Sequence, residues 1–91
     1  MKSLKMTNQA TKFLGSLDAK QYRQVGQKIF SLMHDSMPQD SAGMTGANNG
    51  ERRVDIGEYR IIYIASETEV SIQVIGKRND DEVYRIWQRM L

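Results

Sequence analysis

Three cations and a phenol in the second half of the sequence could together bind a phosphate and a base. Arg60 lies at the start of an apolar run, residues 59–65, and Lys77 and Arg78 lie at the end of another. If the two runs pair as a β-hairpin, the start of one lies beside the end of the other. Arg60 and Arg78 then meet at one rim of the sheet, with Tyr84 just beyond. Guanidinium groups beside an aromatic ring suit a nucleic acid better than they suit a protein core.

Each of these side chains also has an ordinary structural interpretation, which the sequence leaves open. The arginines could form ion pairs with acidic residues close in sequence, and the ring of Tyr84 could anchor a helix on the sheet. The acidic neighbours are Asp55 and Glu58 for Arg60, and Asp81 and Glu82 for Arg78. Both arginines are expected near strand ends, where their head groups reach solvent and truncation costs little stability.

The only histidine and the acidic run at residues 80–82 are weaker candidates for chemistry. His34 could act as a general base near neutral pH, but it falls at the end of a predicted helix, where a cation meets the helix dipole favourably. The acidic run precedes another predicted helix and complements its N-terminal dipole. No histidine accompanies these acids, so we expect no metal site.

Length and composition predict one small cytoplasmic domain spanning residues 1–91. The hydrophobic content of 40% is enough for one modest core, and the net charge of +2 is only weak evidence for a nucleic-acid partner. There are no cysteines, so disulfides and thiolate metal sites are excluded and a reducing compartment is expected. We expect no secretory signal, and no stretch approaches the roughly 20 apolar residues of a membrane span.

Hydrophobic periodicity and capping residues predict a helical hairpin in the first half of the chain. Alternation around Leu4 and Met6 indicates a short strand with one buried face. Thr7 or Asn8 is expected to cap a helix that runs to about Gly15, and Asp18 is expected to cap a second helix. The second helix repeats apolar residues at three- and four-residue spacing: Tyr22, Val25, Ile29, Leu32 and Met33. Residues 34–50, rich in Gly, Ser and Asn, are predicted as loop.

The second half is predicted to form three strands and a last helix. Residues 53–56 and 59–65 read as strands joined by a turn, with Tyr59 and Tyr63 in the core because they alternate with Arg60. In the third strand one apolar face is expected from Val70, Ile72 and Val74, which Ile75 joins near the end. The last helix is expected from Asp80 or Asp81 to Leu91. The predicted fold is α+β, in the order β-α-α-β-β-β-α, with the helical hairpin on one face of a small, mostly antiparallel sheet.

In element order and length, the whole chain resembles the RelE/ParE superfamily of bacterial toxins, and the RelE branch more closely. The resemblance rests on Met44-Thr45-Gly46, on the segment from Arg53 to Tyr63 and on the segment from Gly76 to Tyr84. It implies a RelE-like microbial RNase fold. It also implies a toxin that cleaves messenger RNA in the ribosomal A site, as a metal-independent endoribonuclease without a cofactor, and a small antitoxin that holds it inactive.

The resemblance also implies roles for single residues. Arg60 and Arg78 match two arginines of the family, and Tyr84 matches its functional tyrosine. Arg53 falls where RelE proteins often have a lysine. The implied catalytic residues are therefore Arg53, Arg60, Arg78 and Tyr84, with Arg52 and Lys77 as further RNA-binding residues.

Two positions depart from the family pattern and leave the general base open. A second basic position of the family is Glu51 here, and Arg53 replaces the first. A lysine with a depressed pKa can act as a base, whereas an arginine stays protonated. Lys77 could substitute, but nothing in the sequence places it correctly.

Two other classes of function stay open on the sequence. One is a gyrase-directed toxin of the ParE type, which binds a protein and cleaves nothing. The other is an inert relative that only binds its antitoxin. The sequence identifies neither the antitoxin nor a codon preference.

Overall fold

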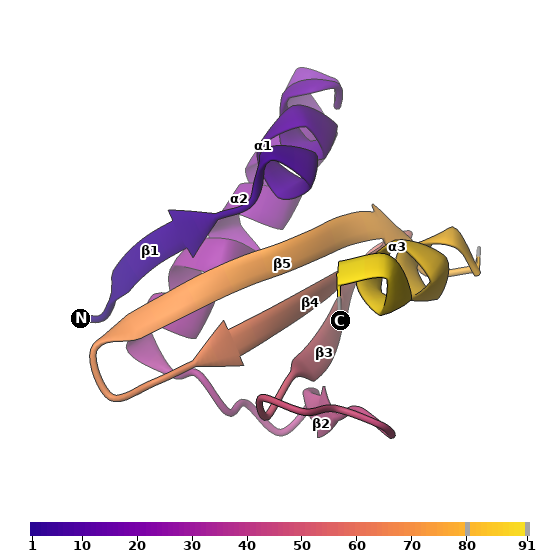
Figure 1. Cartoon of the computed structure of the whole chain (residues 1–91). Helices are drawn as coiled ribbons and strands as arrows, with labels where there is room; N and C mark the ends of the chain where they lie inside the picture. Colours follow the sequence, from indigo (N-terminus) through magenta and orange to yellow (C-terminus); the bar gives the residue numbers. More distant parts are fainter. Residues whose placement is uncertain (80, 91) are drawn as a thin grey trace.

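The elements form in the order expected from the sequence, with one short strand added (Figure 1). The computed structural model describes residues 1–79 and 81–90. Its strands are β1 Ser3–Met6, β2 Ala42–Gly43, β3 Arg52–Ile56, β4 Tyr59–Ala65 and β5 Glu69–Lys77, and its helices are α1 Asn8–Gly15, α2 Ala19–His34 and α3 Glu82–Met90. The added strand, β2, lies in a segment predicted as loop. Its two residues are too few to show any hydrophobic period, so that part of the prediction is wrong.

The strands form one sheet in the order β1-β5-β4-β3-β2. All neighbouring pairs are antiparallel except β1 and β5, which are parallel. The expected mostly antiparallel α+β fold is confirmed. The helical hairpin carries the chain from β1 at one edge of the sheet to β2 at the other, and β3 and β4 then lead back to β5 beside β1.

Both helices of the hairpin begin at the predicted caps. The Thr7 hydroxyl accepts a hydrogen bond from the backbone N–H of Ala10 at 3.2 Å, and the Asp18 carboxylate accepts one from Gln21 at 2.9 Å. Such side-chain acceptors satisfy donors that the first turn of a helix leaves without partners. Asp80 and Leu91, at the expected ends of the last helix, lie outside the described residues; α3 begins one residue after Asp81.

The sheet separates two cores. The helical hairpin covers one face, where Val25, Ile29 and Leu32 of α2 join inward residues of β4 and β5. Helix α3 covers the other face, where Val83 and Trp87 pack on strand residues. Figure 1 shows α2 behind the sheet and α3 in front of it. The last helix is therefore docked on the sheet, and the residues on its face are separated from the hairpin by the strands.

A bulge in the β4–β5 pair changes which residues face α3. Ile62 pairs with Val74 and Tyr63 with Ile72, so Gln73 is an extra residue in β5. Ile72 packs in the core under the hairpin, but Val74 packs with α3. The prediction that Val70, Ile72 and Val74 share one apolar face is therefore wrong for Val74, which points to the opposite face. Because of the bulge, the last residues of β5 alternate in the opposite phase.

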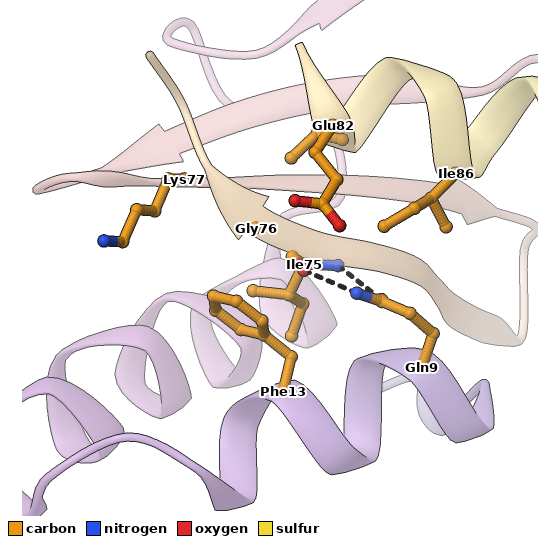
Figure 2. A pocket seen from close by; sticks show the side chains of 8 residues that line it. Gln9, Phe13, Ile75, Gly76, Lys77, Glu82 and Ile86 are labelled. Atoms are coloured by element: carbon orange, nitrogen blue, oxygen red, sulfur yellow. Dashed lines mark hydrogen bonds between the residues drawn. The ribbon is translucent and has the colours of Figure 1, made fainter. Parts of the chain in front are cut away.

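Beyond the end of β1, side chains from the start of α1 cover the free edge of β5. The Gln9 amide donates to the carbonyl of Ile75 at 2.9 Å and accepts from its N–H at 3.0 Å (Figure 2). These two bonds imitate strand pairing and fix α1 to the end of β5. A pocket of about 280 Å³ opens there between α1 and α3, with Phe13 and Ile86 on its sides.

Within residues 1–79 and 81–90, none of the helices has the length and apolar character that crossing a membrane would require.

Candidate active site

The pairing of β3 with β4 brings two predicted site arginines and one carboxylate to the face that α3 covers. Asp55 pairs with Arg60, and Arg53 pairs with Ile62, which packs against α3. Paired residues of neighbouring strands point to the same face, and so do residues two apart in one strand. Arg53, Asp55 and Arg60 therefore share this face. Arg60 also lies beside the end of β5, as the hairpin expected from the sequence requires.

Arg60 is held by two neighbours. Its Nε donates to Asp55 Oδ1 at 2.6 Å and its Nη2 donates to Oδ2 at 3.0 Å. Its Nη1 donates to the hydroxyl of Tyr84, and its Cζ lies 5.6 Å from the centroid of the Tyr84 ring. The Arg60 side chain is only 15% exposed. The prediction that the head group of Arg60 reaches solvent is therefore wrong, because Asp55 and Tyr84 of α3 enclose the guanidinium.

The electrostatics show that three arginines act on one carboxylate. Hydrogen bonding from Arg60 is the main cause that lowers the pKa of Asp55; burial opposes it, and the charges of Arg60, Arg53 and Arg78 lower it further. The pKa of Arg60 is raised, chiefly by the hydrogen bond to Asp55. Arg60 therefore stays charged, and the arginines outnumber the one carboxylate on which all three act.

Arg53 lies in a groove next to Arg60. The groove has a volume of about 350 Å³ and runs between the segment after β2 and helix α3. Its walls are Gly43, Met44 and Thr45 on one side, and Tyr84, Trp87 and Gln88 on the other. A single nucleotide could enter such a groove with its phosphate toward the arginines and its base toward Tyr84.

Arg78 follows the end of β5, where it lines a groove with Asp18 and Gln21 on the side of α2 while its charge still acts on Asp55. Its backbone N–H donates to the carbonyl of Glu58 at 2.9 Å, which brings the end of β5 beside the turn before β4. The side chain is exposed. Within the part of the chain that the structure describes, the ion pairs join Lys5 to Glu69, Lys28 to Asp40 and Arg60 to Asp55. The ion pair that the sequence allowed between Arg60 and Asp55 is thus present. None of these three ion pairs includes Arg78.

Arg52 and Lys77 lie elsewhere. Arg52 alternates with Arg53 along β3, and its guanidinium donates to the Ser41 hydroxyl at 2.9 Å. Lys77 pairs with Tyr59, whose ring is in the core under the helical hairpin. Both residues therefore project from the face opposite to Arg60, and Figure 2 shows the Lys77 side chain pointing away from α3.

His34 and the two core tyrosines lie away from the rim. His34 is the last residue of α2, as expected, and its ring lies 5.2 Å from that of Phe30. Tyr59 and Tyr63 are buried in the core, as predicted from their alternation with Arg60. The acidic run at 80–82 includes Asp80, which lies outside the described residues.

Gly76 determines how closely α3 approaches the site. It pairs with Arg60 and faces α3, and a Cβ at this position would overlap Cγ2 of Val83. Only a glycine lets Val83 come this close to the backbone of β5. Tyr84, the next residue of the helix, is thereby brought to Arg60.

Glu51 is a buried residue whose role the sequence did not predict. The sequence showed only that an acid stands at a position where the RelE pattern has a base. It is 2% exposed; its Oε1 accepts from the backbone N–H of Asn49 at 2.7 Å and its Oε2 accepts from Trp87 Nε1 at 3.1 Å. Burial would raise the pKa of this carboxyl, but hydrogen bonds from Asn49, from its own N–H and from Trp87 outweigh it and lower the pKa. The signal for this role was the apolar helix carrying a tryptophan, whose indole N–H needs a partner when buried.

Several solved structures that this chain resembles are toxins or complexes that contain one. The archaeal RelE–RelB complex from Pyrococcus horikoshii matches with a TM-score of 0.73 at 24% identity, over 85% of this chain and 94% of that chain. The isolated Escherichia coli RelE toxin matches with a TM-score of 0.73 at 19% identity, over 100% of both chains. The chain has the RelE fold.

The toxin–antitoxin complex RelBE2 from Mycobacterium tuberculosis shares the RelE fold, with a TM-score of 0.72 at 20% identity over 85% of this chain and 98% of that chain. No family model matches the sequence, and no curated protein matches it either. The likeness to the RelE fold is therefore one of structure.

Proposed function

We propose that this protein is the toxin of a toxin–antitoxin system, a cytoplasmic endoribonuclease that cuts messenger RNA in the A site of the small ribosomal subunit and so stops translation. The observation that supports this most is the rim formed by Arg53, Arg60, Arg78 and Tyr84 in a chain with the RelE fold. Arg53 and Tyr84 line the groove, Arg60 contacts Tyr84, and the charge of Arg78 acts on Asp55. Guanidinium groups and an aromatic ring are what a phosphate and a base require.

In this proposal the RNA supplies its own nucleophile. The 2′-hydroxyl oxygen forms a bond to the adjacent phosphorus while the bond from phosphorus to the 5′-oxygen breaks. The 2′-hydroxyl loses a proton, and the leaving 5′-oxygen gains one. We assign no metal and no cofactor to this reaction, which requires alignment, charge stabilisation and proton transfer.

Arg60 is our candidate for stabilising the charge that builds on the phosphate. A guanidinium has five N–H donors, and the contacts among the described residues use three of them. The remaining two can reach phosphate oxygens while Asp55 keeps the group oriented. Donors that are fixed before the reaction stabilise a transition state without having to reorganise.

Arg53, Arg78 and Tyr84 complete the proposed site. Arg53 would contact the phosphate from the groove, and Arg78 would contact it from the exposed rim. The ring of Tyr84 would stack on a base beside the cleaved bond. Arg52 and Lys77, on the other face, would at most contact the nucleic acid at a distance from this bond.

The proposed site supplies charge well and proton transfer poorly. Arginine stays protonated, and Asp55 is already paired with Arg60. The ribosome would offset this deficit by aligning the 2′-hydroxyl with the phosphorus. We therefore propose that ribosome-bound message is cut and that naked RNA is cut poorly.

We also propose a cognate antitoxin as the partner. Three of the structures that share this fold are complexes of a toxin with its antitoxin. A positive rim with an open groove would attract an acidic segment, and a segment that folds on binding can cover a large surface for its length. Saturating antitoxin should then raise the thermal unfolding temperature.

Primer extension on a reporter message in a translating extract tests the nuclease. We expect cuts within translated codons and no comparable cuts in free RNA. Arg53→Ala should lower the rate, and Arg53→Lys, its matched control, should keep or raise it if the position acts through its charge. Rapid, site-selective cleavage of free RNA would contradict the ribosome-dependent proposal.

The same assay separates the two alternatives. Growth arrest without message cleavage, and without any need for Arg60, Arg78 and Tyr84 together, would favour a gyrase-directed toxin of the ParE type. Antitoxin binding without growth arrest would favour an inert relative.

A further inference from the structure

Glu51 connects two segments, the 44–49 loop and helix α3, which also meet through apolar contacts between Met44, Ala47 and Trp87. The carboxylate accepts from the N–H of Asn49 on one side and from the indole of Trp87 on the other. The backbone carbonyl of Glu51 also accepts from the N–H of Met44 at 3.1 Å. The residue therefore ties the 44–49 loop to helix α3.

The two segments joined by Glu51 are the two walls of the groove beside Arg53. One wall contains Met44 and Thr45, and the other contains Tyr84 and Trp87. The separation of these walls decides what fits between them. The bond from Trp87, a residue of one wall, to Glu51 limits how far the two walls can separate.

Trp87 and Tyr84 lie on the same side of helix α3. The two residues are three apart on α3, so they lie on the same side of the helix one turn apart. A helix of nine residues does not hold its conformation or position alone and depends on its contacts with the rest of the protein. A shift of Trp87 would therefore shift Tyr84 relative to Arg60.

We propose that Glu51 is a positioning residue, whose buried carboxylate fixes α3 to the 44–49 loop and thereby holds Tyr84 against Arg60. The inference rests on the proposed function, because it assigns Glu51 a part in the same reaction. It also explains the acid at a position where related toxins often carry a base. A lysine ammonium has no acceptor for the two N–H groups that Glu51 satisfies.

Trp87 is the only tryptophan, so its fluorescence reports directly on the position of α3. Glu51→Ala and Glu51→Lys should shift the emission to longer wavelength and increase quenching by acrylamide. Glu51→Gln, which keeps one acceptor, should show a smaller change. Glu67→Ala, which removes an exposed carboxylate from the β4–β5 turn, is the matched control and should show none.

Cleavage in the translating extract then tests the link to Tyr84. Glu51→Ala should reduce the rate by about 10- to 100-fold, because small misplacements of catalytic groups cost that much. Trp87→Phe keeps an aromatic side chain, although a smaller one, and loses the N–H, so it should also reduce the rate. In a Tyr84→Ala background, Glu51→Ala should cost little more, since the group it positions is gone.

The outcomes are distinguishable. Wild-type cleavage by both Glu51→Ala and Trp87→Phe would overturn the proposal, and so would a full, additive loss in the Tyr84→Ala background, which would indicate a general loss of stability. If Glu51→Ala does not fold, Glu51→Gln and Trp87→Phe decide between these results. If the wild-type protein cuts no message, the proposed function fails, and unchanged quenching in Glu51→Ala and Glu51→Lys would still overturn the positioning of α3.

Discussion

At the scale of single residues, Asp55 orients Arg60 without using up its donors. The bidentate pair occupies Nε and one N–H of Nη2, on one edge of the guanidinium. An ion pair and a phosphate contact are therefore compatible on the same side chain. The pair also gives Arg60 a structural role that Arg78, with its exposed side chain, does not share.

Arg60→Ala and Arg78→Ala should therefore differ in stability but not in the direction of their effect on cleavage. Each should reduce cleavage on the order of 100-fold, as the loss of a charge contact in the transition state does. Arg60→Ala should also lower the free energy of unfolding by about 1–3 kcal/mol, because it leaves Asp55 and Tyr84 without their partner. Arg78→Ala should change it by less than about 0.5 kcal/mol.

Urea unfolding and primer extension on the same preparations measure both quantities. Equal stability of the two variants would mean that the Asp55 pair contributes nothing measurable. Wild-type cleavage by both would leave these arginines as ordinary surface cations and would remove the main support for a nuclease.

At the scale of elements, the hairpin β4–β5 could be predicted because its two strands carry clear apolar runs. That pairing alone brings Arg60 beside the end of β5. The helix caps Thr7 and Asp18 could be predicted for a similar reason, since their side chains act within one turn. Each of these features depends on residues that are close in the sequence: neighbouring strands joined by a short turn, or a cap and the helix turn that it begins.

The features that the sequence did not predict depend on contacts between distant elements. No turn or breaker residue marks the bulge at Gln73, and the residues on its two sides, Ile72 and Val74, pack in different cores. The bond from Trp87 to Glu51 joins residues 36 positions apart. Arg60 was expected to reach solvent because the position of α3 over it could not be derived from β4 alone. The roles of the site residues stay predictions.

Gly76→Ala tests the docking of α3. The added Cβ would push Val83 away from β5, so we expect a loss of about 1–3 kcal/mol in the free energy of unfolding and a red shift of the Trp87 emission. Gly26→Ala is the matched control, because a Cβ there meets open space in the middle of α2 and should stabilise the helix slightly. Unchanged stability and emission in Gly76→Ala would show that α3 tolerates a displacement from this strand.

At the scale of the whole molecule, the sheet divides the protein into a larger core and a charged face. The core under the helical hairpin contains most of the buried apolar residues, including Tyr63 and Leu32. The face under α3 contains a smaller core together with two carboxylates, Asp55 and Glu51, whose pKa values are both lowered. The stability of this second face should therefore depend on acid more strongly than that of the first.

The direction of this dependence follows from the lowered pKa values of the two carboxyls. Their ordinary values are 3.8 for Asp55 and 4.5 for Glu51, and both are lower in the folded protein. The folded state then binds these protons less readily than the unfolded state, so their contribution to stability is complete above about pH 5 and is lost as the pH falls below the ordinary values. Wild-type protein should unfold more easily from about pH 4.5 downward.

Asp55→Asn should lower the unfolding midpoint at neutral pH and make its decline in acid shallower, because the titrating group is gone. Asp40→Asn is the matched control: the pKa of Asp40 is also lowered, mainly by its hydrogen bond with Lys28, but its side chain is 54% exposed. Exposed ion pairs contribute little in salt, so this variant should follow the wild-type curve. Urea midpoints from pH 3 to 7 give the comparison. Parallel curves for wild type and Asp55→Asn would place the acid sensitivity outside the Arg60–Asp55 pair and would mean that the pair is as weak as one on an exposed surface.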